Sequence, residues 1–132
     1  MNTTLRAKSP VVRRVLRILY ADDMQELRTI ARIALGTEGH VVECVEDGAL
    51  AYERVAADLN AYDIIISDHH MPNMTGLELV RRLRELGYPG KIIIFSSELS
   101  TETADAYQDL EVDRLLFKPI EPSVLRKLVL EV

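Results

Sequence analysis

Short apolar runs alternate along the chain with longer segments in which apolar residues recur at helical spacing. The apolar runs predict five strands, at residues 15–21, 40–46, 63–67, 91–96 and 113–117. Two of these runs contain three consecutive isoleucines and lack the polar alternation of a half-exposed strand. Unbroken apolar strands of this kind are typical of parallel strands that are covered on both faces.

Between the strands, apolar residues three and four positions apart predict five helices. The positions expected to face the core are Leu27, Ile30, Ala31 and Ala34 in the first helix, Leu50, Val55 and Leu59 in the second, Leu77, Val80 and Leu83 in the third, Ala104 and Tyr107 in the fourth, and Val124, Leu125 and Leu128 in the fifth. Thr75 and Glu78 have the spacing of a capping box, and Pro122 suits the first turn of the last helix. These start signals support the same division of the chain.

The alternation of strand and helix predicts an α/β fold, a doubly wound five-stranded parallel sheet with helices on both faces. Because crossovers between parallel strands are right-handed, few arrangements remain, and at this length we expect the flavodoxin-like strand order 2-1-3-4-5 of a (βα)5 fold. In that order the ligand crevice lies at the carboxyl ends of the first and third strands. Candidate chemistry is therefore expected at that edge.

The composition fits one globular domain. The chain has 132 residues, of which 48% are hydrophobic and 28% charged, enough to bury a core but too few for a second domain. Its apolar runs are far shorter than a membrane span, and its N-terminus lacks the apolar stretch of a secretory signal, so we expect a cytoplasmic protein without membrane contact. The single cysteine, Cys44, excludes an intramolecular disulfide and is expected to be a small buried side chain.

Charge is unevenly distributed along the chain. The net charge is -5, but residues 1–17 hold five basic residues and no acidic one, which leaves 11 basic and 21 acidic residues in the remainder. Such an acidic remainder argues against nucleic-acid binding by the domain. Residues 1–14 are interpreted as a flexible basic N-terminal arm, with a dedicated binding tail as the alternative, and residues 15–132 as the folded domain.

In the sequence DIIISDHHMPNMTG, residues 63–76, a carboxylate, Asp68, directly follows a predicted buried strand. Three roles are open for Asp68: a metal site with the histidine pair, a carboxylate that ends a strand or caps a helix, and a carboxylate that does chemistry. A zinc site at His69 and His70 requires further ligands, and adjacent side chains rarely converge on one ion. His40, the third histidine, precedes a strand and is expected to face solvent.

Polar residues follow four of the predicted strands at the point where each strand ends, and these ends share one edge of the sheet. They are Asp22 and Asp23 after the first strand, Asp68 after the third, Ser96 and Ser97 after the fourth, and Lys118 and Pro119 after the fifth. Each alone has a structural explanation: a capping box of Asp23 with Glu26, the end of a strand at Asp68, a turn at the serine pair, or a surface charge at Lys118. Their coincidence on one edge favours a functional site.

Carboxylates crowded at this edge need a cation, since a pair at ~4 Å repels by up to about 4 kcal/mol at an effective dielectric constant of about 20. Oxygen ligands without a matched set of His or Cys favour Mg²⁺ over Zn²⁺. Lys118 adds an ammonium group that can meet an anion, and the Ser96 hydroxyl can donate to one of the anion's oxygens. Together these groups suit attack on phosphorus, and formation of an aspartyl phosphate is a recognised use of such a carboxylate.

The segments ILYADD, DHHMPNMTG, IIIFSS and LFKP together resemble the receiver domain of two-component response regulators (CheY-like), over roughly residues 15–131. The resemblance implies that Asp68 is the phosphoacceptor and takes a phosphoryl group from the phosphohistidine of a sensor histidine kinase or a histidine phosphotransfer protein. It also implies that Mg²⁺ is held directly by Asp23, Asp68 and the backbone carbonyl of His70, and by Asp22 through bound water.

The same resemblance places Ser96 where the family has Thr or Ser, pairs Lys118 with the acyl phosphate, and makes the peptide bond between Lys118 and Pro119 cis, which only proline makes readily accessible. The His70 side chain is expected at the mouth of the site, where it affects the access of water. The family commonly has Tyr or Phe three residues before the Lys, and here that residue is Leu115. We therefore expect phosphorylation to be retained and its transmission across the adjoining face to be altered.

The sequence thus predicts a phosphorylation-controlled signalling domain that changes its affinity for a partner, and not an enzyme beyond catalysis of its own phosphorylation and dephosphorylation. Two alternatives remain: a receiver-like interaction module that works without phosphorylation, and a Mg²⁺-dependent aspartyl phosphohydrolase. The module is disfavoured because Asp68 and Lys118 are both present, and the hydrolase because His70 stands where its D-x-D motif has the second Asp. The cognate kinase, the downstream target, dimerisation on phosphorylation and any effector domain beyond Val132 stay open.

Overall fold

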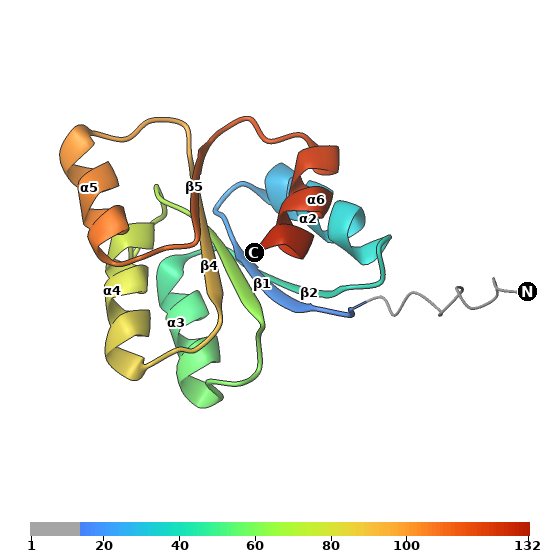
Figure 1. The fold of residues 1–132 in the computed structure, drawn as a ribbon, viewed down its shortest axis with the longest axis horizontal. Coiled ribbons are helices and arrows are strands. Elements are labelled where there is room, and N and C mark those ends of the chain that lie inside the picture. Colours follow the sequence, from blue (N-terminus) through green and yellow to red (C-terminus); the bar gives the residue numbers. More distant parts are fainter. Residues whose placement is uncertain (1–13) are drawn as a thin grey trace, which may run out of the picture.

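The computed structural model describes residues 14–132, and within them five parallel strands form one sheet in the order β2-β1-β3-β4-β5 (Figure 1). The strands are β1 (Arg17–Ala21), β2 (Val41–Val45), β3 (Ile64–Asp68), β4 (Lys91–Ser96) and β5 (Arg114–Phe117). The predicted flavodoxin-like order is confirmed. The expected basic arm, residues 1–14, lies outside the described residues except for Arg14.

Helices cover both faces of this sheet. On one face lie α2 (Gln25–Gly36) and α6 (Pro122–Glu131), and on the other, to the left of the sheet in Figure 1, lie α3 (Gly48–Ala57), α4 (Gly76–Leu86) and α5 (Thr101–Asp109). The result is a three-layer arrangement with the sheet in the middle. Among the helices of residues 14–132, none combines the length and the apolar character that crossing a membrane requires.

The two isoleucine triplets form the centre of the core, because alternate residues of a strand face opposite sides of the sheet. The residues beneath α3, α4 and α5 are Ile65, Ile92 and Ile94, and those beneath α2 and α6 are Ile64, Ile66 and Ile93. All six side chains are buried, and full burial of one such side chain stabilises the fold by about 1.5–3 kcal/mol. The prediction that these strands are covered on both faces is confirmed.

Two of the predicted helix starts are confirmed. The Thr75 hydroxyl accepts a hydrogen bond from the Glu78 backbone N–H, and the Glu78 carboxylate accepts one from the Thr75 N–H, which completes the capping box of α4. Pro122 is the first residue of α6, where its missing N–H has no intrahelical partner to lose. The capping box fixes the point at which the chain turns from the loop after β3 into α4.

The structural alternative for Asp23, a capping box with Glu26, is not observed. α2 begins after Met24 without a side-chain cap. The Met24 backbone N–H instead donates to Asp22 Oδ1 at 3.0 Å. The Asp23 side chain is therefore not used to start the helix, and it stays at the edge of the sheet beside the other carboxylates.

Three predicted side-chain environments are also wrong. Ile30 of α2 and Val124 of α6 are 44% and 48% exposed, because the part of each helix that contacts the sheet is narrower than its apolar stripe. His40 is buried rather than solvent-facing, and its Nδ1 accepts a hydrogen bond from the Leu16 backbone N–H at 3.1 Å. Cys44 is half-buried beside the α2 and α6 layer, so its expected burial is only partial.

Candidate functional site

Three carboxylates lie together at the carboxyl edge of the sheet. Asp22 and Asp23 follow β1, and Asp68 is the last residue of β3, the strand paired with β1. One oxygen atom from each carboxylate lies within 4.8 Å of the other two. Asp22 and Asp68 are 1% and 6% exposed, whereas Asp23 is exposed. Two buried carboxylates at this separation repel each other, so the site requires positive charge.

Lys118 supplies that positive charge. Its Nζ lies 3.1 Å from Asp22 Oδ2 and 3.4 Å from Asp68 Oδ1. The residue follows β5, where its backbone N–H donates to the Ser96 carbonyl at the end of β4 (2.8 Å), and its peptide bond to Pro119 is cis. Because Lys118 and Asp22 are 96 residues apart in the sequence, only the order of the strands brings them together.

Asp22 is held by the protein through both of its carboxylate oxygens. Oδ1 accepts the hydrogen bond from Met24, and Oδ2 accepts one from the Tyr20 hydroxyl at 3.3 Å as well as one from Lys118. Burial, with the Asp22 charge as the second cause, raises the pKa of Tyr20, so the phenol stays protonated and donates. The exposed Asp23 carboxylate is therefore more available than the Asp22 carboxylate to coordinate a metal ion directly.

The Asp68 carboxylate occupies an environment that disfavours its charge. Burial is the largest effect and raises the pKa of Asp68; the Lys118 ammonium acts in the opposite direction, and the Asp22 charge adds to the rise. Lys118 therefore offsets only part of the cost of burying this carboxylate. Additional positive charge at the site would stabilise the ionised form further.

Ser96 lies at the end of β4 with its side chain buried. Its hydroxyl donates to the Glu98 carbonyl at 2.9 Å and accepts from the Glu98 N–H at 3.2 Å. These two bonds stabilise the turn between β4 and α5. The residue is thus placed at the edge of the site, as predicted, but its hydroxyl would have to leave Glu98 before it could donate to an anion beside Asp68.

The two histidines that follow Asp68 point to different partners. His70 is exposed, and its Nε2 lies 3.1 Å from the Glu98 carbonyl. His69 is half-buried, and its Nδ1 lies 2.6 Å from the Tyr107 hydroxyl. The two rings meet edge to face with their centroids 4.7 Å apart. Within residues 14–132, the one cluster of three or more candidate metal ligands consists of aspartates alone, so the structure gives no support to zinc binding by the histidine pair.

Tyr107 is a residue near the site whose contact the sequence did not reveal. The spacing of apolar residues predicted only that it faces the core, and it is fully buried on α5. Its hydroxyl nevertheless reaches the loop that follows Asp68. The available signal was the hydroxyl itself, because a buried hydroxyl on the core side of a helix requires a hydrogen-bond partner.

The donor set at this edge fits a hard divalent cation. The ligand atoms that the structure brings together are carboxylate oxygens, which Mg²⁺ prefers, and the cluster contains no sulfur or imidazole. Asp22, Asp23 and Asp68 could hold such an ion. The resemblance to receiver domains implies the His70 carbonyl, in the loop directly after Asp68, as a further ligand. The negative charges of the buried Asp22 and Asp68 would favour binding of the ion there.

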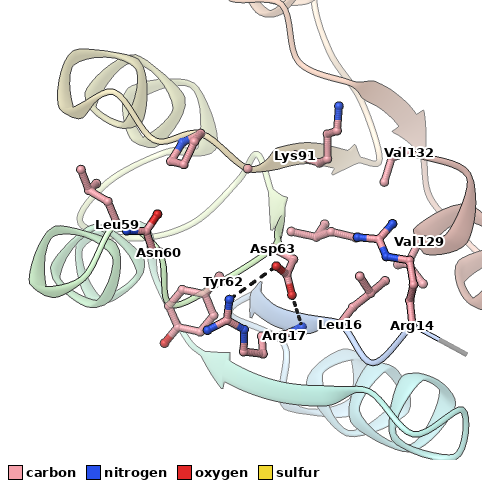
Figure 2. Close-up of a pocket in the computed structure, with 13 residues that line it drawn as sticks. Arg14, Leu16, Arg17, Leu59, Asn60, Tyr62, Asp63, Lys91, Val129 and Val132 are labelled. Atoms are coloured by element: carbon pink, nitrogen blue, oxygen red, sulfur yellow. Dashed lines mark hydrogen bonds and ion pairs between the residues drawn. The ribbon is translucent and has the colours of Figure 1, made fainter. Parts of the chain in front are cut away.

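A second pocket lies at the opposite, amino edge of the sheet and has a volume of about 300 Å³. Figure 2 shows Asp63 in this pocket paired with Arg17, whose backbone N–H donates at 2.8 Å and whose guanidinium lies at 3.5 Å. The backbone hydrogen bond is the main cause that lowers the pKa of Asp63. Asp63 has an arginine of its own as a partner, whereas the three carboxylates at the carboxyl edge have only Lys118 close to two of them, so we place the candidate chemistry at the carboxyl edge.

The fold and the arrangement of these residues agree with three comparisons with known proteins. Residues 18–130 match the family model described as "Response regulator receiver domain". The chain is 32% identical to the two-component response regulator ORR41 of Oryza sativa subsp. japonica over 87% of this chain and 92% of that protein. It is 32% identical to the transcriptional regulatory protein CutR of Streptomyces coelicolor over 83% of this chain, but it spans only 50% of CutR.

A solved structure is similar over almost the whole described chain. The chemotaxis protein CheY4 of Vibrio cholerae superimposes with a TM-score of 0.81 and 29% sequence identity, over 90% of this chain and 99% of that chain. The similarity therefore extends over the complete sheet and its helices rather than over one motif.

Proposed function

The chain belongs to the family of response regulator receiver domains of two-component systems, and from this membership we propose that Asp68 accepts a phosphoryl group in a Mg²⁺-dependent reaction. The observation that carries the proposal is the position of Lys118 Nζ, 3.1 Å from Asp22 and 3.4 Å from Asp68. This ammonium group lies between two buried carboxylates, beside a third that is exposed, and it could pair with an anion once a divalent cation offsets the charge of the carboxylates.

In this proposal Asp68 is the nucleophile. One of its carboxylate oxygens forms a bond to phosphorus as the bond from phosphorus to a histidine nitrogen of the donor breaks, and the imidazole leaves with the electron pair of that bond. A bound Mg²⁺ would supply positive charge that offsets the charge of the phosphoryl oxygens. Lys118, which already contacts Asp68, would remain beside the acyl phosphate and pair with one of its oxygens.

Ser96 connects the site to the turn before α5. To donate to a phosphoryl oxygen, its hydroxyl exchanges the Glu98 carbonyl for the anion. The turn then loses the hydrogen bond from the Ser96 hydroxyl to the Glu98 carbonyl, one of the two bonds that close it. A phosphoryl group adds about -1.5 to -2 charges near neutral pH, enough to bias an equilibrium between two conformations and thereby the affinity for a partner.

The phosphoryl donor in this proposal is a phosphohistidine on a sensor histidine kinase or a histidine phosphotransfer protein, since receiver domains as a family interact with sensor kinases. The domain then acts as a signalling phosphoacceptor and not as an enzyme with a separate substrate. A cytoplasmic location, which the sequence predicts, is part of the same proposal. The downstream partner and dimerisation on phosphorylation stay open.

Incubation with acetyl phosphate and Mg²⁺, followed by intact-mass measurement, tests the proposal. The wild-type chain is expected to gain one phosphoryl group, Asp68→Asn none, and the wild type with EDTA none. Asp105→Asn is the matched control, because it makes the same change on the exposed surface of α5 and should leave the adduct intact.

Two other results would contradict the proposal and point to the alternatives. Absence of any adduct on the folded wild-type chain would favour an interaction module that works without phosphorylation. Catalytic turnover of unrelated phosphoesters, lost in Asp68→Asn, would favour a phosphohydrolase.

A further inference from the structure

Tyr107 anchors α5 to the loop that contains the phosphoacceptor. It is the only buried residue of this helix, and its side chain is 0% exposed. Its hydroxyl lies 2.6 Å from His69 Nδ1, and the two rings meet edge to face at 80° with their centroids 5.6 Å apart. His69 directly follows Asp68 in the chain. A single buried side chain therefore joins α5 to His69, the residue next to the phosphoacceptor.

The backbone around His69 is fixed on both sides. The His69 N–H donates to the Phe95 carbonyl of β4 at 3.0 Å, and the His69 carbonyl accepts from the Gly76 N–H of α4 at 2.9 Å. The imidazole ring, in contrast, reaches across to α5, where Tyr107 holds it. A change in the backbone at Asp68 can thus be passed to α5 through the ring.

The contact between Tyr107 and His69 requires a residue without a side chain at position 76. A Cβ atom at this position would lie 2.7 Å from the Tyr107 hydroxyl and 2.6 Å from the Asp68 carbonyl oxygen, both far closer than such contacts allow. The end of β3, the start of α4 and the middle of α5 therefore meet at the Tyr107 hydroxyl. Close approach of three elements at one polar group makes that group sensitive to small shifts in any of them.

Leu115 offers no comparable polar connection. It is half-buried on β5 and packs against the apolar side chains beneath α3, α4 and α5. An aliphatic side chain can neither donate nor accept a hydrogen bond. Of these two residues, only Tyr107 joins the phosphoacceptor loop to α5 by a directional bond.

We propose that Tyr107 is a positioning residue: its hydrogen bond to His69 holds the loop after Asp68 against α5, and phosphorylation of Asp68 is transmitted to α5 through this bond. The inference rests on the proposed function and names the route by which that site acts on the rest of the domain. The Tyr107 hydroxyl can either donate to or accept from His69 Nδ1, so the bond joins the two side chains with either tautomer of the imidazole. Loss of either partner uncouples α5 from the site without removing the site.

Amide ¹H and ¹⁵N chemical shifts test the proposal, with Mg²⁺ and beryllofluoride, a phosphoryl mimic, as the probe. In the wild type we expect the probe to shift both the amides of residues 69–75 and those of α5. In Tyr107→Phe the shifts of residues 69–75 should persist, whereas those of α5 should fall at least twofold. The matched control is Tyr88→Phe, because the buried Tyr88 hydroxyl donates to the Tyr62 carbonyl at 2.9 Å, at the far edge of the sheet.

Substitution of His69 provides a second test if Tyr107→Phe does not fold. His69→Asn places an amide, which can donate or accept, near the position of Nδ1 and should retain the α5 response, whereas His69→Leu should lose it. An α5 response in Tyr107→Phe or His69→Leu equal to that of Tyr88→Phe would overturn the inference.

The wild type separates this inference from the proposed function. A response of residues 69–75 without any response of α5 would overturn the inference alone. Absence of any response at residues 69–75 would overturn the proposed function together with the inference.

Discussion

Asp68 is a charged residue in a position that does not favour charge. Its carboxylate is 6% exposed, and burial raises its pKa with only partial compensation from Lys118. Residues placed for chemistry are often maintained at some cost in stability. At the residue scale, the site is therefore expected to destabilise the fold that carries it.

Removal of the Asp68 charge should stabilise the protein. Because the pKa is raised in the folded state, the ionised carboxylate costs stability at every pH above the folded-state pKa, and this cost disappears below the unfolded-state value of about 3.9. Asp68→Asn is therefore expected to raise the Tm at pH 7 by a few degrees, and the gain should shrink as the pH is lowered. Thermal unfolding followed by circular dichroism at several pH values checks this; a lower Tm for the variant at pH 7 would contradict it.

Lys118→Met should have the opposite effect. The substitution leaves Asp22 and Asp68 without their shared cation, and an uncompensated pair of buried charges costs roughly 1–3 kcal/mol. Millimolar Mg²⁺ should restore much of the loss, because a ligand that binds only the folded state stabilises it. Urea unfolding with and without Mg²⁺ measures both effects. Equal stability of variant and wild type without Mg²⁺ would show that Lys118 does not compensate these charges.

His40 should make stability depend on pH in the mildly acidic range. Burial lowers its pKa, so as the pH falls below about 6.5 the unfolded chain binds a proton that the folded chain resists, and stability decreases by up to about 1.4 kcal/mol per pH unit. His40→Asn keeps an acceptor for the Leu16 N–H and should flatten this dependence. The free energy of unfolding in urea at pH 7 and at pH 5.5 provides the check. An unchanged slope in the variant would assign the dependence to other groups, such as His69, whose pKa burial also lowers.

At the scale of helices and strands, local sequence patterns predict where an element lies but not how exposed each of its side chains is. The strands and the capping box of α4 follow from neighbouring residues, and the sequence predicted them. The exposure of Ile30 and Val124 and the burial of His40 depend on partners elsewhere in the chain, such as Leu16, which lies 24 residues from His40. A helical pattern shows which face is apolar but not how much of that face the sheet covers.

Gly76 is the glycine at which the elements are packed most tightly around the site. A methyl group there would clash with the Asp68 carbonyl, so Gly76→Ala should destabilise the fold by about 1–3 kcal/mol. Gly36→Ala is the matched control, since it also lies in a helix but has no atom within 4 Å of an added Cβ. That substitution should be stabilising by roughly 0.5–1 kcal/mol. Equal effects of the two substitutions on urea unfolding would contradict the close approach at Gly76.

At the scale of the whole molecule, the strand order creates the site. β1 and β3 are neighbours in the sheet, and β5 lies at its edge, yet Lys118 after β5 reaches both aspartates. The rhythm of strands and helices predicted this convergence at the carboxyl edge. The bond between Tyr107 and His69 and the orientation of the Ser96 hydroxyl could not be predicted, because both depend on how α5 and its preceding turn pack in three dimensions.

The most direct test of the central claim is to locate the phosphoryl group at the level of single residues. After treatment with acetyl phosphate and Mg²⁺, borohydride reduces an aspartyl phosphate to homoserine with release of phosphate, and peptide mass spectrometry identifies the converted residue. The account predicts homoserine at position 68 and nowhere else. Conversion at Asp22 or Asp23, or the absence of any conversion in the folded protein, would contradict it.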